Sequence, residues 1–122
     1  MLKIISKLVP QSARASLSLK TRVSYSIDLN FKSFGQVIYS CDKDYKRIDR
    51  FYSKLWKIEI LVPFEDVLPL KLKTFISTAN LHEEGLVHMT IQVDDKLVSD
   101  QTFAIEKHEF EYTGWLELTY SG

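Results

Sequence analysis

The clearest feature of the chain is an alternation of apolar and polar residues that starts after Thr21. In "RVSYSIDLNF", residues 22–31, every second side chain is apolar, and serine, aspartate or asparagine stands between. A period of two is typical of a β-strand with one buried face. The turn-like letters "SFG" and a second alternating run, "QVIYSC", follow at once, which predicts a β-hairpin. The predicted inward residues are Val23, Tyr25, Ile27, Leu29, Phe31, Val37, Tyr39 and Cys41.

Further runs with the same period continue to the end of the chain. They are "WKIEILVP", "LPLKLKTFISTA", "LVHMTIQV", "KLVSDQTFAI" and "HEFEYTGWLELTY". Seven or eight short strands with this spacing predict an all-β fold over residues 20–122, namely an antiparallel β-sandwich of the immunoglobulin-like or transthyretin-like type.

One segment, "DKDYKRIDRFYSKLW", departs from the period of two. Its apolar side chains recur at helical spacing, and Asp42 is suited to cap a helix N-terminus. The segment therefore predicts one short helix over residues 43–55, with a loop that runs into the strand at Trp56 as the alternative. The apolar positions are Tyr45, Ile48, Tyr52 and Leu55.

Residues 1–19 lack the alternation, and "PQSARASLSLK" is rich in serine and alanine. Pro10 interrupts any helix that begins at Leu2, so we expect a flexible N-terminal arm. No stretch approaches the ~18 apolar residues of a membrane helix, and "MLKIISKLVP" lacks the apolar core of a signal peptide. Cys41 is the only cysteine. These features favour a reducing compartment such as the cytoplasm.

The 122 residues are enough for one domain with a sizeable core, and the formal net charge is zero. The charges are nevertheless uneven along the chain. Residues 1–61 carry 12 Lys and Arg against 5 Asp and Glu, whereas residues 62–122 carry 4 against 11. Two interpretations are open: the two halves of the chain interleave into one balanced surface, or the molecule has a basic and an acidic side that steer a partner or a second copy.

Three aspartates in "VDDKLVSDQ", Asp94, Asp95 and Asp100, raise the question of a cation site. A calcium-binding loop of the EF-hand type that started at Asp94 would need glycine at its sixth position and glutamate at its twelfth. Ser99 and Ile105 stand there instead. Because aspartate tolerates the left-handed conformations of tight turns, "DDK" between two strands predicts a hairpin turn.

The histidines, His82, His88 and His108, have no spacing typical of a zinc site. With four glycines in the chain, no glycine-rich phosphate loop and no GxSxG nucleophile motif is present. The sequence therefore predicts no catalytic residues, no metal and no cofactor. A hydrolase of unrecognised type that uses His88 or His108 is an alternative.

The strongest candidate for binding is the basic and aromatic segment 45–57. Cations that alternate with aromatic rings are typical of proteins that hold single-stranded nucleic acid. In the alternative interpretation, the aromatic rings face the core and the cations face the solvent, and the neutral whole chain argues against nucleic acid. The predicted interaction residues are Tyr45, Lys46, Arg47, Arg50, Lys54 and Lys57.

The order of four short motifs, "VSYSI", "VIYS", "LWKIEI" and "IQVDDKLVSD", resembles the small β-sandwich domain of MmpS-type transport accessory proteins, without their membrane anchor. This chain has Leu55 where that pattern has proline, and Asp95 where it has glycine. The resemblance implies a partner-binding domain that is not an enzyme.

These observations predict a non-catalytic protein-interaction module, and they point to no small-molecule ligand. The expected partner is another protein or a second copy, as in a homodimer, because strand edges can recruit further strands. In a homodimer, Arg47 and Arg50 of one copy would lie near Glu109 and Glu111 of the other, and salt would weaken the contact. The alternatives are a single-stranded nucleic-acid binder through residues 45–57 and the hydrolase.

Overall fold

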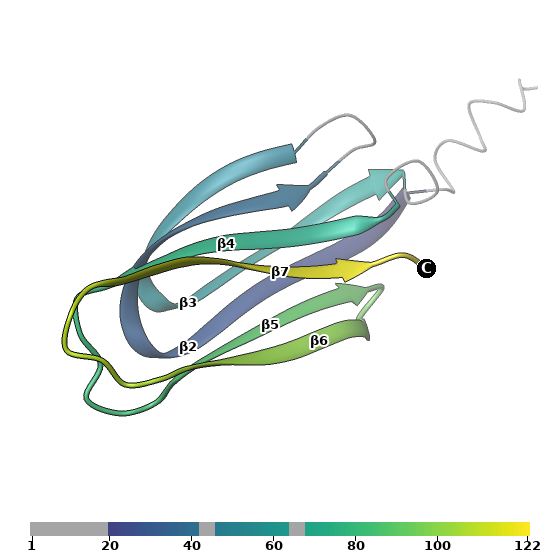
Figure 1. Cartoon of the computed structure of the whole chain (residues 1–122). Coiled ribbons are helices and arrows are strands. Elements are labelled where there is room, and N and C mark those ends of the chain that lie inside the picture. Colours follow the sequence, from purple (N-terminus) through teal and green to yellow (C-terminus); the bar gives the residue numbers. More distant parts are fainter. Residues whose placement is uncertain (1–19, 42–45, 64–67) are drawn as a thin grey trace, which may run out of the picture.

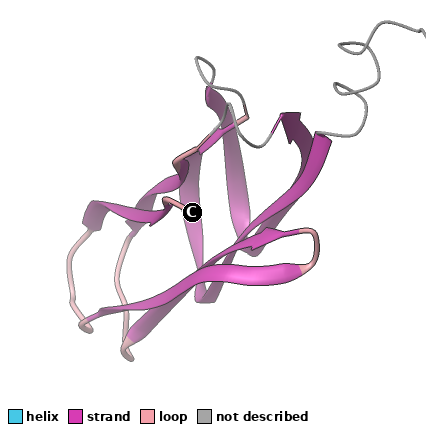
Figure 2. Ribbon diagram, turned by 90° about the vertical axis from the view of Figure 1, so that its right-hand side faces the viewer, coloured by secondary structure: helices cyan, strands magenta, loops and turns pink. Residues whose placement is uncertain are grey.

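The computed structural model describes residues 20–41, 46–63 and 68–122. All secondary structure in these ranges is antiparallel β-strand, and they contain no helix (Figure 2). The predicted all-β class is therefore confirmed. The six strands are β2 (Lys20–Ser40), β3 (Lys46–Pro63), β4 (Leu70–Thr78), β5 (Gly85–Val93), β6 (Lys96–Ile105) and β7 (Tyr112–Tyr120).

The long strand β2 organises the sheet. On one side it pairs with β3 along most of its length, and the register of this pairing shifts between Asp28 and Ser33. On its other side, residues 23–29 pair with β5 and residues 34–39 pair with β4. Figure 1 shows β2 curving between these two stretches. One strand thus serves two groups of neighbours that lie far apart in the sequence.

The sheet curls until it nearly closes on itself. β6 pairs with β5, β7 pairs with β4, and the strand order is β6-β5-β2-β4-β7 with β3 on the free side of β2. The hydroxyl of Ser99 in β6 donates to the carbonyl of Thr119 in β7 at 3.1 Å. The result is a barrel-like sheet. We call β5, β6 and residues 20–29 and 55–63 its first half, and β4, β7 and residues 34–40 and 46–53 its second half.

Both halves contribute side chains to a single core. Tyr25 of the first half lies 5.5 Å from Tyr39 of the second, between ring centroids, and Tyr39 lies 5.5 Å from Trp56. The Tyr25 hydroxyl donates to the Ser40 carbonyl at 2.7 Å, and burial raises the pKa of this hydroxyl. Every predicted inward residue from Val23 to Phe31 is buried, as are Val37 and Tyr39. Cys41, predicted inward, is only half-buried.

The hairpin predicted at "SFG" is wrong, because residues 20–40 form one continuous strand. Gly35 lies within this strand and faces the core. A Cβ atom at Gly35 would lie 2.2 Å from the ring of Phe51, so the missing side chain makes room for that ring. The glycine serves close packing rather than a turn, which is one reason why the chain has six described strands and not seven or eight.

The helix predicted over residues 43–55 and its alternative, a loop, are both wrong for residues 46–55, because Lys46–Pro63 is a strand paired with β2. Residues 43–45 lie outside the described residues. Ile48 and Tyr52 are four residues apart, and this spacing places two residues on one face of a strand as well as on one face of a helix. Both side chains are exposed, whereas Phe51 and Trp56 are buried. Pairing with β2 therefore determines that this segment is a strand and not a helix.

The predicted arm, residues 1–19, lies outside the described residues. Within the described ranges, no helix could cross a membrane.

Candidate binding surface

Aromatic side chains gather on the outer face of the second half of the sheet. Phe34 and Phe75 alternate along their strands with buried residues, Trp115 alternates with half-buried ones, and Tyr52 follows the buried Phe51. These rings therefore point away from the core. The solvent-exposed fractions are 74% for Tyr52 and 47% for Trp115. We call this surface the aromatic face. It consists of Phe34 on β2, Ile48 and Tyr52 on β3, Phe75 on β4 and Trp115 on β7.

The rings form two contacting pairs. Phe34 lies opposite Tyr52 with 4.7 Å between ring centroids, and Phe75 lies opposite Trp115 at 5.3 Å. Phe75 pairs with Gln36 on β2, two residues beyond Phe34. The pairs are therefore offset and cross the four strands as a diagonal stripe. The stripe crosses three spacings between neighbouring strands, so it is roughly 14 Å wide.

Cations accompany the rings on this face. Lys46 and Arg50 share the outward side of β3 with Tyr52, and Lys71 and Lys73 share that of β4 with Phe75. The Lys73 ammonium lies 5.3 Å from the centre of the Trp115 ring, within reach of a cation–π attraction.

Two acidic side chains belong to the β7 side of the same surface. Glu117 lies opposite Lys73 in the β4–β7 register. Glu111 accepts a hydrogen bond from the Ser77 hydroxyl at 3.4 Å. Among the described residues, the positive charge of this surface is therefore concentrated over β3 and β4.

A shallow depression of about 450 Å³ continues the aromatic face towards the curve of β2. Phe34 and Tyr52 form its apolar wall. Lys32 and Asn80 supply a cation and an amide at its rim. The depression therefore combines rings, charge and hydrogen-bonding groups in one place.

The predicted interaction segment does not form one surface. Tyr45 lies outside the described residues, and Lys46 and Arg50 lie on the aromatic face. Arg47 pairs with Tyr39 and takes the opposite side of β3, although it is exposed. Lys54 lies where the β2–β3 register shifts. Lys57 pairs with Ser26 and lies on the outer face of the first half.

None of the four rings of the aromatic face was among the predicted interaction residues, although Tyr52 lies within the predicted segment 45–57. Phe34, Phe75 and Trp115 stand at positions that alternate with the core residues of their own strands. An aromatic residue at a position that the period of two assigns to solvent was the available signal. The interpretation that the aromatic residues of segment 45–57 face the core is right for Phe51 and Trp56 and wrong for Tyr52.

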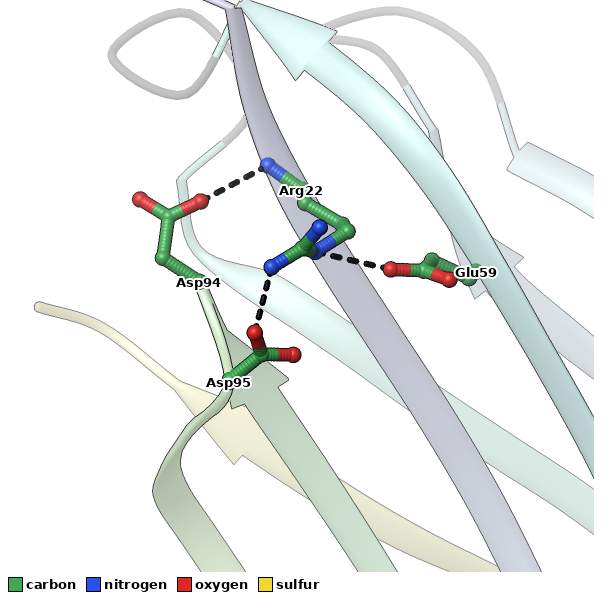
Figure 3. A network of polar contacts seen from close by, with 4 residues as sticks. All are labelled: Arg22, Glu59, Asp94 and Asp95. Carbon is green, nitrogen blue, oxygen red and sulfur yellow. Dashed lines mark hydrogen bonds and ion pairs between the residues drawn. The ribbon is translucent and has the colours of Figure 1, made fainter.

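The outer face of the first half carries a charge network around Arg22 (Figure 3). Its guanidinium forms ion pairs with Glu59, at 2.8 Å, and with Asp95. Its backbone N–H donates to the Asp94 carboxylate at 3.1 Å. Asp94 and Asp95 have φ angles of 49° and 69°, the left-handed values of a tight hairpin turn. The predicted turn is therefore confirmed. The positive charge beside its carboxylates is the guanidinium of Arg22.

Small hydroxyl-bearing residues line a second depression on this outer face, of about 370 Å³. Ser26 and Thr90 share a hydrogen bond of 2.5 Å between their hydroxyl oxygens. Lys57 and Glu59 form one wall and Gln92 contributes to the other. This lining contains both basic and acidic side chains. Its one aromatic residue, Tyr25, has its side chain in the core.

The histidines lie apart from one another. His88 Nε2 lies 2.8 Å from the Asp100 carboxylate on the outer face of the first half. His108 Nδ1 contacts the Phe110 carbonyl, and His82 is exposed. No group of three potential metal ligands occurs in the described part of the chain. The described side-chain hydrogen bond of His88 goes to a carboxylate and not to a hydroxyl or thiol, which are the groups that a histidine base activates as nucleophiles.

Asp49 of the second half is hydrogen-bonded to Trp56 of the first half, within the same strand β3. Its carboxylate accepts hydrogen bonds from the Trp56 indole at 2.9 Å and from the Arg50 backbone N–H at 2.8 Å. These two bonds, the indole first, hold the pKa of Asp49 below its usual value. Because Asp49 precedes and Trp56 follows the register shift, the contact joins both ends of the curved strand.

Comparison of the chain with protein-family models, curated proteins and solved structures gives no match.

Proposed function

We propose that this domain is a non-catalytic binding module that holds a macromolecular partner on the aromatic face. The observation that carries the proposal is the exposure of Tyr52 and Trp115 on one face of four paired strands. Large apolar side chains that remain in water contribute little to folding, and contiguous patches of them mark interaction sites. Tyrosine and tryptophan are also the side chains that most often dominate binding energy.

The expectation from the sequence, a protein partner or a second copy, belongs to this proposal. The resemblance to MmpS-type domains supports partner binding without catalysis. The finer fold assignment, an immunoglobulin-like or transthyretin-like sandwich, is likewise proposed. It is supported by two halves of the sheet that pack on one core.

Photo-crosslinking from each outer face tests the binding role. A benzophenone-bearing amino acid replaces Tyr52 on the aromatic face or, as the matched control, Lys57 on the other outer face. We expect position 52 to yield a crosslinked complex in extracts of cells that express the chain, and position 57 to yield none. Protease or nuclease digestion then gives the class of the partner. Equal crosslinking from both positions would contradict the proposal.

A further inference from the structure

We infer that the partner on the aromatic face is single-stranded nucleic acid, an inference that rests on the binding role proposed above. Binding of single-stranded nucleic acid requires two kinds of side chain at one site. Unpaired bases need flat rings on which to stack, and the phosphates between them need cations within reach. The aromatic face offers both, and the outer face of the first half offers only the cations.

The rings lie where successive bases could stack. Tyr52 and Trp115 occupy the two ends of the diagonal stripe, and Phe34 and Phe75 fill its centre. Strand faces that bind single-stranded RNA use two or three aromatic residues in this way. The depression of about 450 Å³ beside Phe34 and Tyr52 adds room next to a ring. The Asn80 amide at its rim can donate to and accept from the edge of a base.

The cations lie beside the rings, and of the four only Lys73 lies opposite an acidic residue, Glu117, in the strand register. Lys46 and Arg50 precede Tyr52 on the outward side of β3. Lys71 and Lys73 precede Phe75 on the outward side of β4. Glu117 and Glu111 belong to the β7 side. A phosphate backbone that runs over β3, β2 and β4 therefore meets an excess of positive charge. Four cations stand against two carboxylates, that of Glu117 opposite Lys73 and that of Glu111 at Ser77. This local excess of positive charge exists in a chain whose formal net charge is zero.

The same charges disfavour a second copy as the occupant. A two-fold dimer through the aromatic face would bring the four cations of both copies into one interface with only Glu111 and Glu117 of each copy to balance them, and excess like charge is destabilising. Double-stranded nucleic acid would satisfy the cations but not the rings, because its bases are already paired and stacked. The combination of rings and cations selects the single strand.

Fluorescence anisotropy of a labelled short oligothymidylate, titrated with the full chain, tests the inference. We expect salt-sensitive binding, with log K falling against log salt with a slope of up to about −3 if all four cations neutralise phosphates at ~0.7 each. A duplex of equal length should bind less tightly. Emission from Trp115, the exposed tryptophan among the described residues, should fall as a base stacks on it.

Three variants locate the site. Tyr52→Ser should weaken binding about tenfold, the scale of one lost stacking contact. Arg50→Gln should reduce the salt slope by about 0.7, the share of one phosphate. Lys57→Gln removes the same charge from the other outer face and should leave affinity and slope unchanged. Circular dichroism confirms that each variant is folded.

The outcomes separate this inference from the binding role. If the oligonucleotide does not bind, or if Tyr52→Ser and Lys57→Gln behave alike, the nucleic-acid inference is wrong. If Tyr52→Ser then abolishes a self-association seen by sedimentation, the occupant is protein and the binding role stands. If the chain binds neither oligonucleotide nor itself, and position 52 gives no crosslink, both proposals fail.

Discussion

The two outer faces of the sheet share strands β2 and β3 and yet differ in chemistry. On the first half, hydroxyls and charges satisfy each other: Arg22 has two carboxylate partners, and Ser26 bonds Thr90. On the second half, rings stand in water with cations beside them. β2 contributes to both faces, so the backbone does not cause the difference. The comparison shows that the packing of the core determines which residues occupy the inward positions. The outward positions do not pack in the core, so their residues can serve binding instead.

If the aromatic face were needed for folding, its side chains would contribute as much to stability as the buried ones. Tyr25→Thr removes a ring that is fully buried, and we expect a loss of about 4 kcal/mol in the free energy of unfolding. Tyr52→Thr removes the same atoms from a mostly exposed ring that packs against the Phe34 ring, and it should cost less than about 1 kcal/mol. Urea denaturation of both variants measures the difference. Equal losses would mean that the aromatic face is part of the structural core.

A second pair of variants tests how the strands under the two faces are packed. Gly35→Val places methyl groups where the Phe51 ring lies, so we expect a loss of about 3 kcal/mol. Ser24→Val enlarges a residue on the other outer face, beside a depression with room for it, and should change stability by less than about 0.5 kcal/mol. Denaturant midpoints give both numbers. A tolerated valine at position 35 would disprove the role assigned to that glycine.

The contact between Asp49 and Trp56 joins the two halves, and its removal should have a moderate effect. Trp56→Phe keeps a ring in the core and deletes the indole N–H, so we expect a loss of about 1 kcal/mol. The thermal midpoint at neutral pH measures this loss. The control is the double variant Trp56→Phe with Asp49→Asn. Because the two side chains contact each other, its loss of stability should be smaller than the sum of the losses of the two single variants.

The same carboxylate predicts a pH dependence. The pKa of Asp49 is lower in the folded chain than in the unfolded chain, where an aspartate titrates near ~3.9. Its contribution to stability is therefore present above that unfolded value and is lost as the pH falls through the folded value. Asp49→Asn should show a smaller loss of stability on acidification than the unaltered chain. Identical acid unfolding curves would rule out this carboxylate as a contributor.

The smallest effect is expected at the polar network of the first half. Arg22→Gln removes two ion pairs whose side chains are about half exposed, so stability should fall by less than about 1 kcal/mol. High salt should shrink the difference further, since it screens exposed charges. Lys73→Gln is the matched change on the aromatic face and should alter stability even less. Thermal midpoints at low and high salt compare the two.

The sequence predicted what depends on local patterns. The period of two located the buried side chains from Val23 to Phe31, and "DDK" identified the turn at Asp94 and Asp95 because the left-handed conformation is a property of those residues themselves. Gly35 could not be interpreted in the same way. Its function depends on Phe51, which lies opposite it only after β3 has paired with β2.

The candidate site was predicted less well than the fold. Lys46 and Arg50 were identified, but Tyr52 was assigned to a helix because its spacing from Ile48 fits both a helix and one face of a strand. Phe75 and Trp115 are 40 residues apart in the sequence and meet only through the β4–β7 register. The rings of the aromatic face come from four strands, and no local pattern shows which strands are neighbours.

The double pairing of β2 has a consequence for how the molecule assembles and comes apart. The β2–β3 ladder joins segments close in sequence and can form early, whereas pairing of Val23 with Val93 must close a long loop. Once formed, neither group of neighbours can leave without exposing one side of the same strand. Amide hydrogens along β2 should therefore exchange only through global unfolding, so that the chain melts as one cooperative unit.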